Sequence, residues 1–267
     1  VKTVQGGNPY VGAPAFVSRA FRHTSIYVRN DRIRTPADLK GRKVGVPEYQ
    51  LTANVWARAF LRDDYGVTPA DIHWIRGGLE EAGRLEKISI TLPPDIRLDP
   101  VPEGRTLNGM LEAGEIDAFM GPRVPSCFAR GHPKVSWLFP DPIAAATDYF
   151  KRTGIFPIMH IIGVRRTLVE QHPWLPAAVF KAFEQSKKIA VARLADTSAA
   201  KVTLPFLEEQ VKGARDLMGE DYWPYGVDAN RKTLETFLRH HQAQGLSSRL
   251  VTVEELFHPT TFETYKL

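Results

Sequence analysis

The sequence predicts an α/β protein with a mainly helical carboxyl-terminal region. Over residues 24–120, short β-rich segments alternate with a helical pattern and with turns, which is typical of α/β folds with parallel strands. From Pro173 onward, apolar residues recur at helical spacing instead. The 267 residues are enough for one large domain or two lobes, with a sizeable core in either case.

The first half of the chain is predicted to contain strands and helices in turn. Strand patterns lie at residues 24–28, 43–46, 72–75 and 116–120. A helix is expected over residues 52–64, where Leu51, Val55 and Ala59 share one face and Thr52 is the expected N-cap. A connecting turn, a long excursion rich in Gly, Pro and charge, and a short helix are expected at residues 36–39, 77–105 and 106–113.

The second half is predicted to contain one strand and three helices. Residues 155–164 are the most apolar stretch of the chain and are expected to form the most buried strand of this half. Helices are expected from Pro173 to Leu194, over residues 198–218, and from Asp228, as N-cap, to Gly245.

Composition excludes several classes of protein. No apolar run approaches the roughly 20 residues that span a bilayer, so no membrane segment is expected. Cys127 is the only cysteine, which excludes an intramolecular disulfide and a multi-cysteine metal site and fits a cytoplasmic location. The sequence has no glycine-rich phosphate loop, no H-E-x-x-H metal motif and no nucleophile elbow, and we predict no cofactor.

Basic residues are concentrated near the amino terminus. Residues 1–47 hold nine Lys or Arg against two acids, within a net charge of +5. No Lys/Arg run of the kind that tracks a phosphate backbone is present, so nucleic acid is not an expected partner. A small anionic ligand is the expected partner, and a solvated basic face is the alternative. The oligomeric state stays open, with a homo-oligomer among the alternatives.

The first candidate site lies just before the strand at residue 24. Ser18, Arg19, Arg22 and His23 occur together there. A guanidinium binds a carboxylate through two parallel hydrogen bonds, and a histidine exchanges protons near neutral pH. We interpret this group as carboxylate-binding; a surface loop with arginines paired to distant acids is the alternative.

The second candidate site is the turn between the strand at 43–46 and the following helix. A helix start presents free backbone N–H groups and the positive end of the helix dipole to anions. Glu48, Tyr49, Gln50 and Thr52 occupy this turn, at the carboxyl end of a strand where ligands bind in open α/β sheets. An ordinary turn capped by Thr52 is the alternative.

Two further positions are candidates. Arg123 follows a predicted strand directly and, with Ser126, is interpreted as ligand-binding, whereas Cys127 reads as a small buried side chain. His160 lies on the apolar strand at 155–164. A histidine there is usually a core residue, but proton transfer to an aromatic ring needs such a group in a dry setting.

Taken together, these segments resemble the 4,5-dihydroxyphthalate decarboxylase family. The resemblance is carried by Pro-x-Phe-x-Ser-Arg-x-Phe-Arg-His, Gly-Val-Pro-Glu-Tyr-Gln-x-Thr-Ala, Pro-Arg-x-Pro-Ser-Cys-Phe and Thr-Gly-Ile-Phe-Pro-Ile-Met-His, which begin at Pro14, Gly45, Pro122 and Thr153. Two later motifs, Trp-Pro-Tyr-Gly from Trp223 and Thr-Leu-Glu-Thr-Phe-Leu-Arg from Thr233, also match. The resemblance to this family covers the chain from about Pro9 to the end.

The resemblance implies a two-lobed fold similar to type II periplasmic binding proteins. Residues 1–28 and 150–267 would form the first lobe, and residues 29–149 the second lobe and crossover. Family members are expected to have some sixty residues ahead of Val1, and the opening Val-Lys-Thr-Val already resembles the inside of an element.

The resemblance also implies cofactor-independent decarboxylation of 4,5-dihydroxyphthalate to protocatechuate and CO2. Arg19, Arg22 or Arg123 would hold the retained carboxylate, and His23 or His160 would transfer protons, with Glu48 and Tyr49 at the catechol hydroxyls. A divalent metal held by His23, Glu48 and His160 is an alternative. The rival function is a solute-binding protein that holds an aromatic carboxylate without chemistry.

Overall fold

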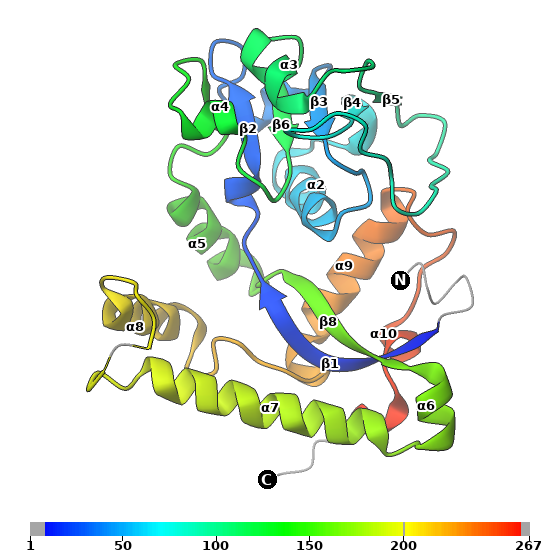
Figure 1. The fold of residues 1–267 in the computed structure, drawn as a ribbon, viewed down its shortest axis with the longest axis vertical. Helices are drawn as coiled ribbons and strands as arrows, with labels where there is room; N and C mark the ends of the chain where they lie inside the picture. The colour runs from blue at the N-terminus through cyan, green and yellow to red at the C-terminus, as the bar shows by residue number, and fades with distance from the viewer. Residues whose placement is uncertain (1–8, 200, 263–267) are drawn as a thin grey trace. The chain divides into compact units, whose positions relative to one another are not determined.

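The computed structural model describes residues 9–199 and 201–262, which form two compact units (Figure 1). One unit comprises Val1–Arg19, Ile158–Glu235 and Val251–Leu267, and the other comprises Ala20–Pro157 and Thr236–Leu250. We call them unit 1 and unit 2. The predicted lobe boundaries at residues 28 and 149 therefore differ from the observed ones. Residues 236–250 belong to unit 2 because they pack on its first long helix, where the Gln244 amide donates to the Val55 carbonyl.

Unit 2 is built on a six-stranded sheet with the order β5-β4-β3-β6-β2-β7. The strands are β2 (Ile26–Arg29), β3 (Lys43–Val46), β4 (His73–Arg76), β5 (Leu98–Pro100), β6 (Ala118–Met120) and β7 (Val135–Trp137). The sheet is parallel from β5 through β6, as predicted, whereas β2 runs antiparallel to both β6 and β7. The sequence-based prediction missed the short strands β5 and β7, because three residues are too few to show an alternating pattern.

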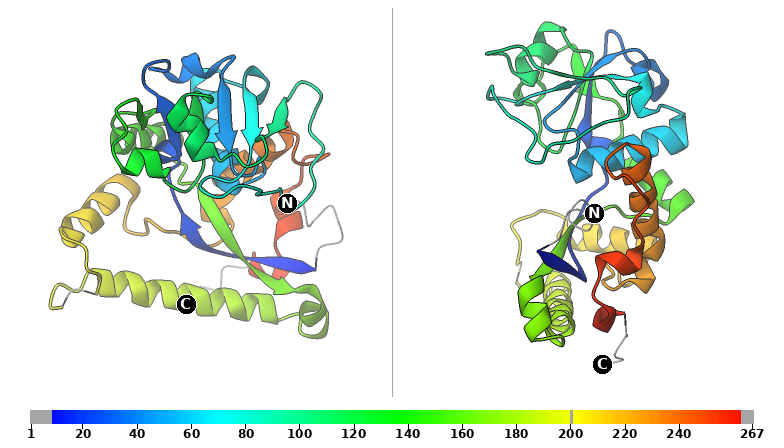
Figure 2. Two further views of the ribbon diagram at one scale, coloured as in Figure 1. Left: turned by 45° about the horizontal axis from the view of Figure 1, so that its top comes forward. Right: turned by 90° about the vertical axis from the view of Figure 1, so that its right-hand side faces the viewer.

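Two crossovers of opposite direction surround the central strand β3. Helix α2 (Thr52–Tyr65) leads from β3 to β4, and α3 (Leu107–Ala113) leads from β5 back past β3 to β6. Since such crossovers are right-handed, the two helices lie on opposite faces of the sheet (Figure 2). Gly45 permits the close approach of α3, because a Cβ at this position would lie 2.8 Å from the Leu107 side chain.

Several helix ends in unit 2 follow local rules, and others do not. Helix α3 is capped by the Thr106 hydroxyl, which accepts from the Gly109 amide, and it ends at Gly114 with positive φ. Helix α2 has Leu51 as its N-cap residue without a side-chain cap bond, so the prediction of Thr52 as cap is wrong. Thr52 is instead the first residue of α2 and lies inside the first turn of that helix. The remaining helices are α4 (Ser126–Ala129) and α5 (Pro142–Thr153), which the prediction missed.

Unit 1 contains a long two-stranded antiparallel ladder and a group of helices. Strand β1 (Tyr10–Arg19) pairs with β8 (Ile158–Arg165), and the helices are α6 (Arg166–Gln171), α7 (Leu175–Leu194), α8 (Leu207–Met218), the start of α9 (Arg231–Ala243), and α10 (Val253–Leu256). The predicted burial of β8 is wrong: His160 and Ile161 are exposed, because β1 is the only strand beside β8 in the described part of the chain. Helix α8 begins at Leu207, later than predicted, shortly after Pro205.

Short 3-10 turns connect several of these elements. They are η1 (His23–Ser25), η2 (Pro36–Leu39), η3 (Pro69–Asp71), η4 (Asp228–Asn230) and η5 (Pro259–Thr261). Asp228 thus opens the turn that leads into α9 rather than capping that helix directly. None of the helices within residues 9–199 and 201–262 is long and apolar enough to cross a membrane. The opening Val-Lys-Thr-Val lies outside the described residues.

The core of unit 2 makes a direct stability prediction. Leu111 is fully buried among Leu107, Phe119 and Met110, whereas Leu250 of the same unit is 50% exposed. Leu111→Ala is expected to lower the free energy of unfolding by about 3 kcal/mol, because it leaves a cavity in a packed core. Leu250→Ala should change it by less than about 0.5 kcal/mol. Urea unfolding followed by tryptophan fluorescence measures both, and equal effects would contradict the assigned core.

Candidate functional site

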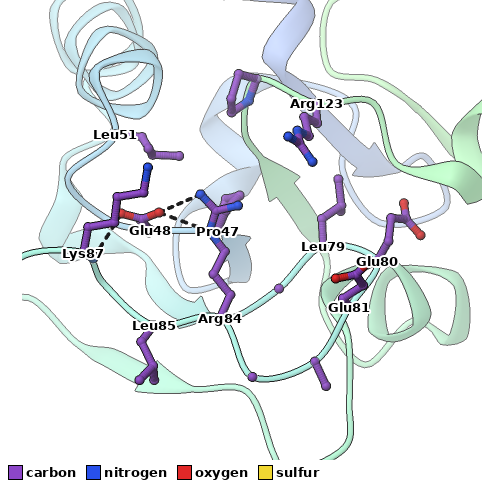
Figure 3. A pocket seen from close by; sticks show the side chains of 14 residues that line it. Pro47, Glu48, Leu51, Leu79, Glu80, Glu81, Arg84, Leu85, Lys87 and Arg123 are labelled. Atoms are coloured by element: carbon purple, nitrogen blue, oxygen red, sulfur yellow. Dashed lines mark hydrogen bonds and ion pairs between the residues drawn. The ribbon is translucent and has the colours of Figure 1, made fainter.

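The principal pocket of unit 2 lies at the carboxyl ends of three neighbouring strands. The segments after β3, β4 and β6 enclose a volume of about 680 Å³ (Figure 3). Its lining residues are Pro47, Glu48, Leu51, Gly78, Leu79, Glu80, Glu81, Ala82, Gly83, Arg84, Leu85, Lys87, Pro122 and Arg123. Strand order reverses between β3 and β6, so the pocket occupies the switch point where open α/β sheets bind ligands. The sequence predicted this edge from Glu48 and Arg123.

Glu48 is the buried carboxylate of this pocket. Its side chain is 2% exposed, and its Oε1 accepts from Nε and Nη2 of Arg84 at 3.1 and 2.6 Å (Figure 3). The Lys87 amide lies 3.4 Å from the other oxygen. The two Arg84 donors replace hydrogen bonds to water that the buried Glu48 carboxylate has lost.

Tyr49 and Gln50 face protein groups. Glu86 accepts from the Tyr49 backbone amide and from the Gln50 side chain, and Gln50 also donates to the Ile88 carbonyl at 2.7 Å. The Tyr49 ring is fully buried, 3.8 Å from the Arg58 guanidinium, and this burial raises the pKa of Tyr49. Neither residue lines the pocket, in contrast to the predicted substrate contacts. The anion expected at the helix start is here a carboxylate of the protein itself.

Two cations on the pocket wall have no carboxylate partner among the residues that the structure describes. Arg123 follows β6 and is exposed, and Lys87 extends from the loop after β4 (Figure 3). Ser126, by contrast, is bound to Glu80, which accepts from its backbone amide and its hydroxyl at 2.8 and 2.9 Å. Arg123 and Lys87 are therefore the pocket groups best placed to receive an anion.

His23 lies at the same edge of the sheet but in an aromatic cage. Because β2 runs antiparallel to β6, the turn η1 that enters β2 is at the carboxyl end of β6. The imidazole is stacked on Phe60 at 4.3 Å and contacts Phe139 and Tyr149, and its Nδ1 is buried without a hydrogen-bond partner. Burial lowers the pKa of His23 to about 4, opposed by the Asp64 carboxylate. His23 is thus neutral at pH 7 and does not line the pocket.

Arg22, which precedes η1, and Thr52, the first residue of α2, complete the predicted residues of unit 2. Both are half-buried, and neither lines the pocket. Burial lowers the pKa of Arg22. Cys127 is buried, as predicted, and burial raises the pKa of its thiol.

The other predicted site residues belong to unit 1. Arg19 is buried at the end of β1, where it donates to the Pro224 carbonyl at 2.6 Å and to the Asn230 side chain. Burial lowers the pKa of Arg19 to about 10. Ser18 lies opposite His160 in the β1–β8 ladder, and the His160 side chain is exposed rather than in a dry setting. Arg19 therefore has an evident structural role within unit 1.

Sequence reasoning missed four charged residues that line the pocket, Glu80, Glu81, Arg84 and Lys87, and one beside it, Glu86, which binds the turn after β3. Arg84, Glu86 and Lys87 lie in the segment that was predicted only as a long excursion. One signal was available, since Gly77-Gly78 follows a strand end at the same sheet edge as Glu48 and is succeeded by a cluster of charges. Their contact with the turn at Glu48–Gln50 depends on the path of a loop, which no periodicity records.

The described part of the chain contains no group of three or more His, Cys, Asp and Glu side chains arranged to hold a metal ion. Glu48 instead forms an ion pair with Arg84, and the His23 ring stacks on Phe60 within its aromatic cage. The predictions of no cofactor and of the metal alternative both stay predictions.

The fold and the pocket define an α/β protein with a pocket at the carboxyl ends of its strands. No protein-family model matches the chain. A 4,5-dihydroxyphthalate decarboxylase from Comamonas testosteroni is 57% identical over 268 residues, covering 100% of this chain and 81% of that protein. Another from Pseudomonas putida is 60% identical over 152 residues, covering 57% of this chain and 59% of that protein. The chain belongs to the 4,5-dihydroxyphthalate decarboxylase family, as its motifs predicted.

Two solved structures are similar in the course of the chain. They are the periplasmic aliphatic sulphonate binding protein of Escherichia coli, with a TM-score of 0.46 and 14% identity, and a periplasmic sulfonate-binding protein of Methylobacillus flagellatus, with 0.44 and 16%. Each match covers 96% of this chain, and 76% and 69% of the respective neighbour.

The caged histidine predicts a pH-dependent stability. The unfolded chain binds a proton at His23 near pH 6.5, whereas the folded protein resists it down to about pH 4. Stability is therefore expected to fall as the pH drops through this window, by about 3 kcal/mol once below it. His23→Phe should remove that part of the slope while keeping the stack, and the exposed His172→Phe should not. Urea unfolding at pH 4 to 8 measures the difference; parallel wild-type and His23→Phe curves would contradict it.

Proposed function

We propose that this protein removes one carboxylate from 4,5-dihydroxyphthalate as CO2 and leaves protocatechuate. Two lines of support meet here: the chain belongs to the decarboxylase family over its whole length, and one pocket combines a buried carboxylate with two cations that have no carboxylate partner within residues 9–199 and 201–262. The second line is the observation that carries the proposal. A dihydroxylated aromatic dicarboxylate needs cations for its two carboxylates and an acceptor for its phenolic proton.

In the proposed complex, Arg123 and Lys87 neutralise the two carboxylates of the substrate. Arg123 can bind one carboxylate through two parallel hydrogen bonds, while Lys87 acts as a point charge. Glu48 then faces the catechol hydroxyls. Leu51, Leu79 and Leu85 supply apolar surface, and a departing carboxylate placed against such surface favours neutral CO2.

The ring itself serves as the electron sink. Each carboxylate of 4,5-dihydroxyphthalate has a hydroxyl para to it. Glu48 takes the proton of that hydroxyl, and the para carbon that bears the carboxylate takes up one proton, which gives a dienone. The carbon–carboxylate bond then breaks, CO2 leaves, and its electron pair restores the aromatic phenolate. Glu48 returns its proton to this phenolate, so one proton is consumed for each CO2 released.

The proton for the ring carbon needs a donor. Lys87 is an ammonium on the pocket wall, and it regains its proton from solvent. His23 is neutral at pH 7, because burial lowers its pKa to about 4, and is therefore a poor donor. A positioned acid or base typically contributes about 10²–10⁴-fold in rate.

One assay tests the proposed function directly. The protein is mixed with 4,5-dihydroxyphthalate, and CO2 release, proton uptake and the change in ultraviolet absorbance are followed together. We expect one proton taken up per CO2. Tight binding without turnover would overturn the enzyme assignment and favour the rival solute-binding function.

Pocket variants make the proposed roles testable. Glu48→Gln is expected to lower kcat by about 10²–10⁴-fold with little change in KM, because it removes the proton acceptor. Arg123→Met should raise KM by about 10-fold or more, since a charged hydrogen-bonding partner is lost. Steady-state kinetics measure both effects.

His160→Gln and His23→Ala provide the contrast for these pocket variants. A loss of kcat in either histidine variant equal to that of Glu48→Gln would move the proton transfer to that histidine. Full turnover in both would remove the histidines from the proton path.

A further inference from the structure

The loop after β4 and the turn after β3 exchange charged groups in both directions. Glu48 of the turn accepts from the Arg84 side chain and lies near the Lys87 amide of the loop. Glu86 of the loop accepts from the Tyr49 amide and the Gln50 side chain of the turn. Residues 84–88 and 48–50 are thus joined by crossed carboxylates, one from each side.

Arg84 is anchored at both of its ends. Its carbonyl accepts from the Arg76 guanidinium at 3.0 Å, at the last residue of β4, and its own guanidinium binds Oε1 of Glu48. Its side chain is 37% exposed on the pocket wall, whereas Glu48 is 2% exposed. The exposed partner therefore supplies the counter-charge on which the buried partner depends.

We infer that Arg84 is a positioning residue for the decarboxylation, which holds the Glu48 carboxylate in place on the pocket wall, with Glu86 holding the loop in place. This inference rests on the proposed function for the role of Glu48 as proton acceptor. Two donors of Arg84 bind the same oxygen of Glu48, which leaves the second oxygen of Glu48, near the Lys87 amide, as the more weakly bound one.

A direct substrate contact by Arg84 would give a different result from a positioning role. Loss of a carboxylate ligand raises KM, whereas loss of the counter-charge of a buried base lowers kcat and makes that base harder to ionise. The acidic limb of the pH profile of kcat/KM distinguishes them, because it reports ionisation in the free enzyme.

The experiment compares Arg84→Met, Arg84→Lys and Glu86→Gln with the wild-type protein. Arg97→Met is the matched control, since Arg97 is 67% exposed, pairs with Asp99 and does not line the pocket. Arg84→Met is expected to shift the acidic limb of the kcat/KM profile to higher pH by about one unit. It should also lower kcat by about ten-fold or more, with KM nearly unchanged. Arg84→Lys should restore part of the shift, Glu86→Gln should lower kcat less, and Arg97→Met should match the wild type.

A carbon NMR titration of the side-chain carboxyl groups tests the inference without turnover. The Glu48 resonance is assigned by its loss in Glu48→Gln, and its titration midpoint is expected to rise by about one pH unit in Arg84→Met. An unmoved midpoint, or a change in KM alone, would overturn the positioning role. Absence of turnover in the wild-type protein would refute the proposed function instead, while the NMR result still decides the role of Arg84. If Arg84→Met fails to fold, Arg84→Lys carries the same comparison.

Discussion

A carboxylate as buried as that of Glu48 stays charged only when donors replace the water that it has lost. Here the replacement comes from a loop distant in sequence, through the guanidinium of Arg84 and the amide of Lys87. The same loop carries Glu86, which binds the backbone of Tyr49 and the side chain of Gln50. Both the position of the Glu48 carboxylate and the contact of the loop with the turn therefore depend on one set of crossed ion and hydrogen-bond contacts.

The sheet explains why these groups meet. Strands β4, β3 and β6 are parallel neighbours, so the segments that follow them emerge at one edge. Beneath that edge, Arg58 is buried against the rings of Tyr49 and Trp74 and donates to the Tyr49 carbonyl at 2.7 Å. Burial lowers the pKa of Arg58. The contacts of Arg58 thus hold one side of the turn after β3 that carries Glu48, and the charged loop after β4 holds the other side.

The sequence predicted the parts of this site that follow local rules. Strand β3 and the short helix α3 have clear patterns and clear boundaries, and they lie within a residue of their expected positions. Glu48 and Arg123 were found because each follows a strand end, and parallel strands bring such ends together. His160 was misjudged for a physical reason: an apolar run predicts a buried strand only when both faces of that strand are covered, and the consecutive residues His160 and Ile161 are both exposed.

Local sequence patterns do not predict contacts between residues that are far apart along the chain. The contact between Arg84 and Glu48 spans a loop of irregular structure, and the burial of Arg19 depends on Pro224 and Asn230, which are far away along the chain. Arg19 ends strand β1 and Arg84 lies in the loop between β4 and β5, yet only Arg84 lines the pocket. The two arginines differ in the groups that they bind: Arg19 donates to backbone and amide oxygens, and Arg84 donates to a buried carboxylate. A guanidinium that binds neutral oxygens stabilises the fold. A guanidinium that binds a buried carboxylate, next to two cations without a carboxylate partner in the described part of the chain, can control when that carboxylate accepts a proton.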